Sequence, residues 1–500
     1  MSAEKNTIET TLDHVPAGTP TDEELYGRVR LPALPEGVTR AGLIRDVVKI
    51  SLPSLVELVL TQLTSIADQI MVGQLPGEEG VSGLAAVGLA VQPKFLLMTA
   101  LMALNVGTTA LIARFRGRQD RVNANQAFRQ GIVLCFLITL VFMAAGLATS
   151  GVMIRFMAGT GNMSERAIAL GTRYLDIQLY GFLPLCLTFT ITAALRGLGE
   201  SRLPLFYNTV ANVVNIFLNW VMIYGKLGCP AMGVEGAAWA TVIGQLVAFV
   251  IAGWIVLDKR RYIHLDLRAR FRFDRGLLIG LVTIGIPSMV EQLLLRTGLI
   301  IYSRMVAGLG DVDFATHQVC MSLQALSFLM GQAFANASTT LMGQSLGKGR
   351  YDMAALYVRQ SRTLGILVSL VFAALLVSFN RGFIALYNST PEVIDTGAKI
   401  LILLAASQPF QADQFIASGA LRGAGDTRFT AAAVAATVLG LRTILGYLMI
   451  QVLGLGLWGA WIALITDQVS RTFIIAVRYS GGKWKRSAAV RFAAADAARG

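Results

Sequence analysis

Charged residues are scarce in this sequence, and cysteines are few. Asp, Glu, Lys and Arg make up 15% of its 500 residues, whereas hydrophobic residues make up 54%. A soluble domain normally carries about a quarter charged residues. The four cysteines lie in or beside apolar segments without metal-ligand spacing, which indicates small packing residues and no disulfide framework. These shortages argue against an ordinary soluble protein.

Recognisable catalytic motifs are also missing. The glycine-rich segment Gly343–Gly349 lacks the spacing of a phosphate-binding P-loop and follows an expected helix, so ATP-driven pumping is not expected. We find no nucleophile–base pair and no metal constellation. We therefore expect no enzyme and no cofactor. Residues 1–40 are polar and show no cleavable signal-peptide pattern.

Long apolar segments are abundant, and each is long enough to cross a bilayer as a helix of about 20 residues. They predict an all-α polytopic membrane protein with about twelve transmembrane helices, because lipid offers no hydrogen-bond partners to irregular backbone. The expected helices are 47–73, 84–112, 127–151, 167–195, 203–225, 234–257, 277–307, 314–342, 354–380, 394–421, 429–453 and 457–479.

The formal net charge of the sequence is +13, and its basic residues are concentrated in alternate loops between the expected helices. Five arginines lie in 114–129 and seven Lys or Arg in 258–275, whereas the alternate loops are poor in basic residues. Basic loops stay in the cytoplasm, so both termini are expected there and nucleic-acid binding is not. The predicted parts are a disordered tail (1–40), a first lobe (41–257), a basic cytoplasmic linker (258–275), a second lobe (276–480) and a second tail (481–500).

The two halves repeat one another in order along the chain. The segment Pro53–Glu57 returns as Pro287–Glu291, and Ala194–Arg202 returns as Ala420–Arg428. Equivalent loops are basic in both halves, so the repeats have the same orientation. Parallel repeats are an architecture of secondary transporters, with the substrate site between the halves near the membrane midplane.

Ionisable residues inside the expected helices suggest function, because a charge in the membrane is costly. Asp68 and Glu57 lie three turns apart on one face of the first helix, with no basic partner on that helix. An unpaired buried carboxylate takes up a proton or binds a cation. Glu57 has an alternative reading, as a helix-end residue that reaches the interface.

Asparagines form a polar stripe on the fifth expected helix. Their spacing of three and four residues places them on one face. Amide oxygens are ligands for hard cations, but asparagines also join membrane helices by hydrogen bonds, and both readings stay open. The stripe consists of Asn208, Asn212, Asn215 and Asn219.

In the second half, Glu291 repeats Glu57, but Tyr302 occupies the position equivalent to Asp68. The proposed ion site therefore belongs to the first half. Arg442 is expected to form a structural ion pair with Asp413 or Asp467. As candidates for coupling or substrate contact we include Glu57, Glu291, Tyr302, Gln411, Asp413 and Arg442.

Several of these motifs together resemble the multidrug and toxic compound extrusion (MATE) family, specifically its NorM-like bacterial members, over about residues 42–486. The matching pieces are Asp68–Gly73, the turns Leu195–Gly197 and Leu421–Gly423, the segment Val221–Thr241, the pairs His317–Gln318 and Gly343–Gln344, and the ending Gly482–Lys485.

The resemblance implies export of amphipathic, often cationic organic compounds in exchange for Na⁺ or H⁺ by alternating access, in a bacterial inner membrane. It also implies a first-lobe cation or proton site made by Asp68, Asn215, Asn219 and Thr241. The second lobe departs from the family pattern. Leu295 stands where some members have a glutamate and Gln411 where some have an aspartate, which puts a second ion site in doubt.

We expect small organic substrates and the lipid bilayer as partners, and a chain that acts as a monomer. One alternative is a lipid-linked sugar flippase of the same superfamily, although basic residues inside the expected helices are scarce apart from Arg296, Arg304 and Arg442. Another is a passive channel or scaffold. The sequence does not decide between Na⁺ and H⁺.

Overall fold

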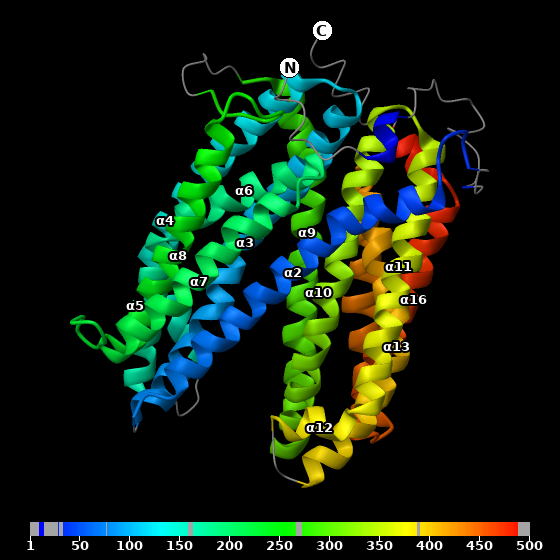
Figure 1. The fold of residues 1–500 in the computed structure, drawn as a ribbon. Helices are drawn as coiled ribbons and strands as arrows, with labels where there is room; N and C mark the ends of the chain where they lie inside the picture. The colour runs from blue at the N-terminus through cyan, green and yellow to red at the C-terminus, as the bar shows by residue number, and fades with distance from the viewer. Residues whose placement is uncertain are drawn as a thin grey trace. The chain divides into compact units, whose positions relative to one another are not determined.

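The computed structural model describes residues 10–14, 29, 34–76, 78–158, 164–266, 273–387 and 391–488. The predictions for the rest of the 1–40 tail, for linker residues 267–272 and for residues 489–500 lie outside this range. The described part is almost entirely helical and contains no strand (Figure 1). The all-α prediction is confirmed.

The helices of the first half are α2 (Arg40–Gly73), α3 (Glu78–Gly117), α4 (Arg121–Ala158), α5 (Glu165–Tyr180), α6 (Phe182–Leu198), α7 (Arg202–Tyr224) and α8 (Gly233–Leu257). Those of the second half are α9 (Arg275–Ala307), α10 (Asp311–Gly347), α11 (Tyr351–Ser378), the short α12 (Asn380–Ala385), α13 (Pro391–Gly423), α14 (Thr427–Val434) and α16 (Gly456–Ser480). Between α14 and α16 lie the π-helical η3 (Ala435–Arg442), α15 (Thr443–Tyr447) and the π-helical η4 (Leu448–Val452).

Each of the twelve expected helices has a counterpart, with two irregularities. The fourth is broken at Gly181 into α5 and α6, which meet at a bend of 52°. The eleventh runs from α14 to η4 through π-helical turns. Among the described helices, nine are long and apolar enough to cross a membrane, or ten if the bent pair is one span. The long helices α2 and α10 are not among these nine.

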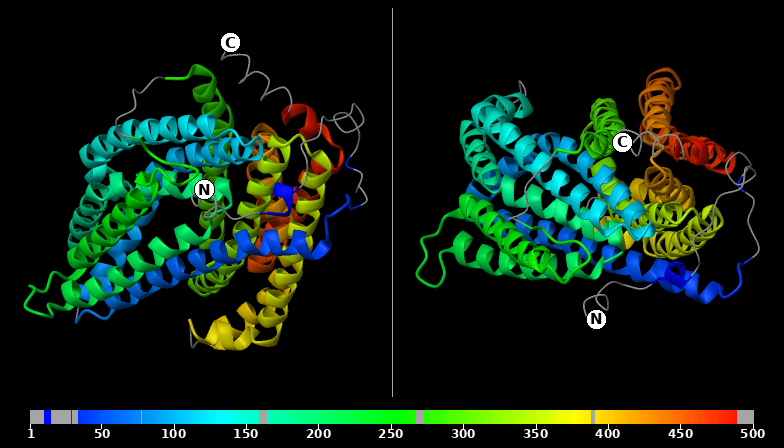
Figure 2. Two further views of the ribbon diagram at one scale, coloured as in Figure 1. Left: turned by 45° about the horizontal axis from the view of Figure 1, so that its top comes forward. Right: turned by 90° about the horizontal axis from the view of Figure 1, so that it is seen from above.

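The chain divides into two compact units. The first contains the described residues of Val56–Ile112 and Asp120–Val282, and the second those of Glu9–Leu55, Ala113–Gln119 and Thr283–Gly500. In the first unit α7 packs along α8, and α4 packs against α5 and α6; in the second, α13 packs against α10, α11 and α16 (Figures 1 and 2). The lobe boundaries expected from the repeat remain a prediction.

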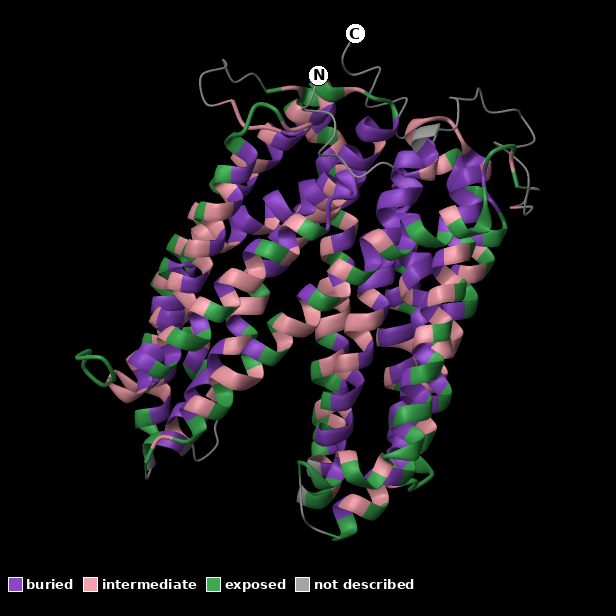
Figure 3. Ribbon diagram, viewed as in Figure 1, coloured by how far each residue is buried: buried purple, intermediate pink, exposed green. Residues whose placement is uncertain are grey.

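Many large apolar residues are exposed. Exposed and buried positions occur along the same helices (Figure 3). Phe156, Trp254 and Val152 are 83%, 78% and 71% exposed. Apolar residues outside and packed helices inside are expected where the surrounding solvent is lipid.

A short segment of the predicted N-terminal tail is ordered against the second unit. Thr11–His14 forms a turn of 3₁₀ helix, and Leu12 is 1% exposed among side chains of α2, α10 and α11. The backbone N–H of Thr11 donates to Asp46 at 2.6 Å, and the Lys348 ammonium donates to the Leu12 carbonyl at 2.5 Å. These contacts explain why the first half of α2 belongs with the second unit.

Glycine permits close helix contact between α13 and α10. A Cβ atom at Gly419 would lie 2.5 Å from the carbonyl oxygen of Ala335, and the Thr339 hydroxyl donates to the Gly419 carbonyl at 2.8 Å. Small residues that let two backbones approach are a usual means of packing membrane helices.

We therefore expect Gly419→Ala to destabilise the second unit by about 1–2 kcal/mol, because the added methyl group meets backbone that cannot turn away. Thermal unfolding of the purified protein in detergent measures the effect. The control is Gly253→Ala in α8, where a Cβ would meet no atom within 4 Å. Equal melting temperatures for the two variants would contradict the close contact.

Candidate cation site

The carboxylate of Asp68 lies among polar side chains from α7 and α8. The Asn219 amide Nδ2 donates to Asp68 Oδ1, and Asn219 itself is fully buried. Asn215, 5% exposed, stands one turn earlier on α7 and approaches Thr241 of α8. The four residues predicted for the site are therefore brought together in the first unit.

The Asn215 amide has two orientations with different partners. In one, its nitrogen donates to the Thr241 hydroxyl at 3.4 Å. In the other, its nitrogen donates to Asp68 Oδ1 at 3.0 Å and its oxygen accepts from the Thr241 backbone N–H at 3.1 Å. In the first orientation the Asn215 oxygen also accepts from Asn219 Nδ2 at 3.4 Å, so both of its bonds are long. The second orientation makes two shorter hydrogen bonds and is favoured.

The site contains a buried acceptor without a donor. Within the described residues, Asn219 Oδ1 has no hydrogen-bond partner, and Asp68 forms no ion pair. An unsatisfied buried oxygen costs about 1–3 kcal/mol. A proton on the Asp68 carboxylate or a hard cation held between these oxygens would satisfy it.

Side-chain contacts connect α2 and α7 along their length. Asn208 donates to Glu57 at 2.8 Å, Asn219 donates to Asp68, and the Tyr224 hydroxyl donates to the Met71 carbonyl at 2.9 Å. The contacts advance together along both helices, so within the first unit the two helices run in the same direction with matched register.

Glu57 is a buried member of an ion pair. It is 6% exposed and accepts from Arg196 Nη2 at 2.9 Å, at the end of α6. Glu57 is therefore not a helix-end residue, because α2 runs from Arg40 to Gly73 and the carboxylate is held inside the first unit. The base that neutralises this carboxylate comes from the repeated Leu-Arg-Gly turn, which an inspection of α2 alone does not reveal.

The second unit repeats this arrangement. Glu291 accepts from Arg422 at 3.4 Å and from the Thr430 hydroxyl at 2.8 Å. Pro-x-x-x-Glu and Leu-Arg-Gly are thus partners in both halves: the glutamate of one motif binds the arginine of the other. The negative charges of two coupling candidates, Glu57 and Glu291, are therefore each balanced by an arginine.

The remaining candidates of the second unit are held in other contacts. Asp413 binds Arg362 through both carboxylate oxygens, so Arg442 pairs with Asp467, the other expected partner. Asp467 also accepts from Arg471 at 2.8 Å. The guanidinium of Arg442 lies 5.8 Å from the Tyr302 ring centroid, and Gln411 accepts from Ser327 at 2.8 Å. Within the second unit, these candidates are distributed over separate contacts.

Lys94 of α3 was not singled out in the sequence, although a charge within the expected helix 84–112 was a visible signal. Its ammonium donates to Gln178 of α5 at 2.6 Å and interacts electrostatically with Asp68. A positive charge close to the site opposes binding of any further cation.

A polytopic helical protein with a repeated half and an intramembrane carboxylate belongs to the class of secondary transporters. The chain is a member of the MatE family, whose model matches residues 53–221 and again residues 287–448. The match in each half confirms the repeat and the suspected family. Its members are multidrug efflux transporters.

Curated relatives agree with this assignment, and solved structures agree with the fold. The chain is 27% identical to the probable multidrug resistance protein NorM of Thermotoga maritima, covering 89% of this chain and 94% of that protein. It is 26% identical to the multidrug resistance protein MdtK of Yersinia enterocolitica, covering 87% and 94%. The fold is similar to an outward-facing multidrug resistance MATE transporter of the MOP superfamily, with a TM-score of 0.81, 22% identity and coverage of 94% and 99%.

The buried ion pair of Glu57 with Arg196 predicts that Glu57→Gln destabilises the protein. Removing one charge of a buried pair leaves Arg196 uncompensated, so we expect a loss of about 3 kcal/mol and a clearly lower melting temperature. Adding Arg196→Met should recover part of that loss. A double variant that is less stable than Glu57→Gln would argue against the pair.

Proposed function

We propose that this chain is an ion-coupled antiporter that exports amphipathic, often cationic organic compounds by alternating access, in exchange for Na⁺ or H⁺ bound at Asp68. The observation that carries the proposal is the unpaired Asp68 carboxylate beside the unsatisfied oxygen of Asn219. Glu57, Glu291 and Asp467, by contrast, are each bound to arginine.

Coupling requires that the site bind its cation with different strength in the two states of the transporter. A coupling free energy of about 1–3 kcal/mol changes affinity by about 5-fold to 150-fold, and the effect is reciprocal. A cation at Asp68 would then weaken substrate binding, and substrate would release the cation. Asn215 and Asn219 on α7 can change distance to Asp68 on α2 without breaking any helix.

The topology in this proposal places the basic loops and both termini in the cytoplasm of a bacterium, with the protein spanning the inner membrane as a monomer. The junction between α3 and α4 and the described segment after α8 carry clustered arginine and lysine. Such clusters remain on the cytoplasmic side during insertion.

Asp68→Asn tests the proposal directly. The amide can still accept and donate hydrogen bonds but cannot exchange a cation, so we expect transport to fall to background while the protein stays folded and inserted. Dye efflux from proteoliposomes under an imposed Na⁺ gradient and, separately, a pH gradient measures this and identifies the ion. Glu291→Gln is the matched acid-to-amide control, with a weaker effect expected. Undiminished efflux by Asp68→Asn would refute the site.

Lys94→Gln should strengthen cation binding, whereas Asp68→Asn should abolish it. Loss of the ammonium charge removes repulsion at Asp68, and about 1 kcal/mol of repulsion corresponds to about a fivefold change in affinity. Half-maximal transport should therefore need about fivefold less of the coupling cation. The control is Lys399→Gln at an exposed position of α13. If Lys94→Gln needs as much coupling cation as the unmodified chain, or more, then Lys94 does not repel the cation at Asp68.

A further inference from the structure

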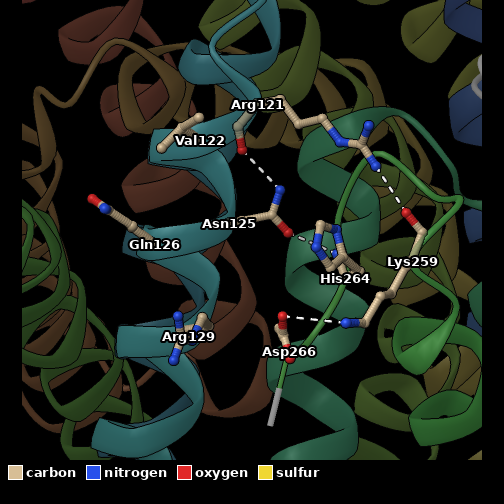
Figure 4. A pocket seen from close by; sticks show the side chains of 8 residues that line it. All are labelled: Arg121, Val122, Asn125, Gln126, Arg129, Lys259, His264 and Asp266. Carbon is tan, nitrogen blue, oxygen red and sulfur yellow. Dashed lines mark hydrogen bonds and ion pairs between the residues drawn. The ribbon is translucent and has the colours of Figure 1, made fainter. Parts of the chain in front are cut away.

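A basic cavity of about 510 Å³ lies in the first unit, between the start of α4 and the segment that follows α8 (Figure 4). It is separate from the Asp68 site in its residues and in its charge. Arg121, Asn125 and Arg129 line it from α4, and Lys259, His264 and Asp266 line it from the other side.

The walls of the cavity are fixed by hydrogen bonds. The Arg121 guanidinium donates to the carbonyls of Tyr262 at 3.1 Å, Lys259 at 3.1 Å and Arg261 at 2.5 Å. Asn125 donates to the Tyr262 carbonyl at 2.9 Å and accepts from the His264 backbone N–H at 2.7 Å. The segment after α8 is thus tied to α4, and the cavity keeps its shape without a ligand.

The charge of the cavity is unbalanced. Arg121, Arg129 and Lys259 are positive, and Asp266 is the negative residue in the lining, at 3.4 Å from the Lys259 ammonium. Burial and the nearby Arg121 lower the pKa of His264, so its ring is neutral at pH 7. The lining therefore has a net charge of about +2, which suits an anion with more than one oxygen.

The end of the cavity at Arg129 lies at the depth of the lipid headgroups. No Asp, Glu, Lys or Arg lies between Arg129 and Arg155 of α4, so the hydrocarbon region begins close to Arg129. Arg121 is eight residues earlier, about 12 Å further out at 1.5 Å per residue, and so lies beyond the headgroup layer at the aqueous end of the cavity. The headgroup layer occupies about 5–8 Å on each side of the hydrocarbon core. Trp254 in the last turn of α8 is 78% exposed, as aromatic residues at this boundary commonly are.

We propose that this cavity binds the phosphate group of an anionic phospholipid of the cytoplasmic leaflet. The leaflet assignment rests on the topology proposed above; the site itself does not depend on ion coupling. Basic cavities between membrane helices on the cytoplasmic side are suited to anionic headgroups. A lipid is favoured over a soluble anion because the cavity adjoins the hydrocarbon boundary on α4 and has exposed apolar Val122 in its lining.

The test uses native mass spectrometry of the full chain, released from detergent with either phosphatidylglycerol or phosphatidylcholine of the same acyl chains. We expect preferential retention of phosphatidylglycerol, reduced about tenfold in Lys259→Gln/Arg129→Gln and reduced again by high salt. The control is Arg173→Gln/Arg381→Gln, which removes the same charge from two arginine side chains that are each 72% exposed and lie outside the cavity. If the double variant does not fold, Lys259→Gln alone gives the same comparison, because that side chain is 68% exposed.

Equal loss of phosphatidylglycerol in the two double variants would overturn the site, since it would show a response to overall charge. Equal retention of phosphatidylglycerol and phosphatidylcholine would also overturn it. Displacement of bound lipid by millimolar inorganic phosphate would assign the cavity to a soluble anion and overturn the lipid proposal. Asp68→Asn should retain phosphatidylglycerol as the unmodified chain does, so failure of the transport proposal and failure of this one are distinguishable.

Discussion

The contact of Glu57 with Arg196 and Asn208 determines how α2 and α7 are aligned, and the candidate cation site depends on that alignment. Glu57 and Asp68 are eleven residues apart on α2, as Asn208 and Asn219 are on α7. Eleven residues are about three helical turns, so the side chains return to the same face. Once Glu57 meets Asn208, Asp68 must meet Asn219. Breaking the Glu57 pair leaves a buried charge uncompensated, which makes a shift of register costly.

The repeat preserves this constraint in the second unit but not the chemistry that it supports in the first. Glu291, Arg422 and Thr430 reproduce the contact of Glu57, Arg196 and Asn208. Where the first half has Asp68, the second has Tyr302, whose ring lies 5.8 Å from the guanidinium of Arg442. Arg442 and Arg471 share Asp467. Two arginines against one aspartate leave net positive charge beside Tyr302, and this charge would repel a cation. The absence of an acid at Tyr302 and this charge agree with an ion site in the first half alone.

The sequence was sufficient for the fold because helix length, hydropathy and the repeat are properties of local segments. The Asn215 and Asn219 spacing likewise predicts one face of α7, and the structure places that face beside Asp68. Partners distant in the chain could not be derived this way. Arg196 neutralises Glu57 across 139 residues, and Lys94 approaches Asp68 from another helix. The π-helical turns of η3, which carry Arg442 toward Asp467, have no clear sequence pattern either.

The acids of this protein therefore fall into two groups with different physical roles. Four of them are bound to arginines, whose charge is permanent at any ordinary pH, and they hold helices together: Glu57, Glu291, Asp413 and Asp467. Asp68 has amide neighbours and a lysine that acts at a distance. Amides stabilise a carboxylate without neutralising it, and the lysine charge limits how tightly a cation can bind. A transported ion must bind well enough to enter and weakly enough to leave. An arginine bound directly to Asp68 would prevent the ion from entering the site. A site without Lys94 would hinder the ion from leaving it.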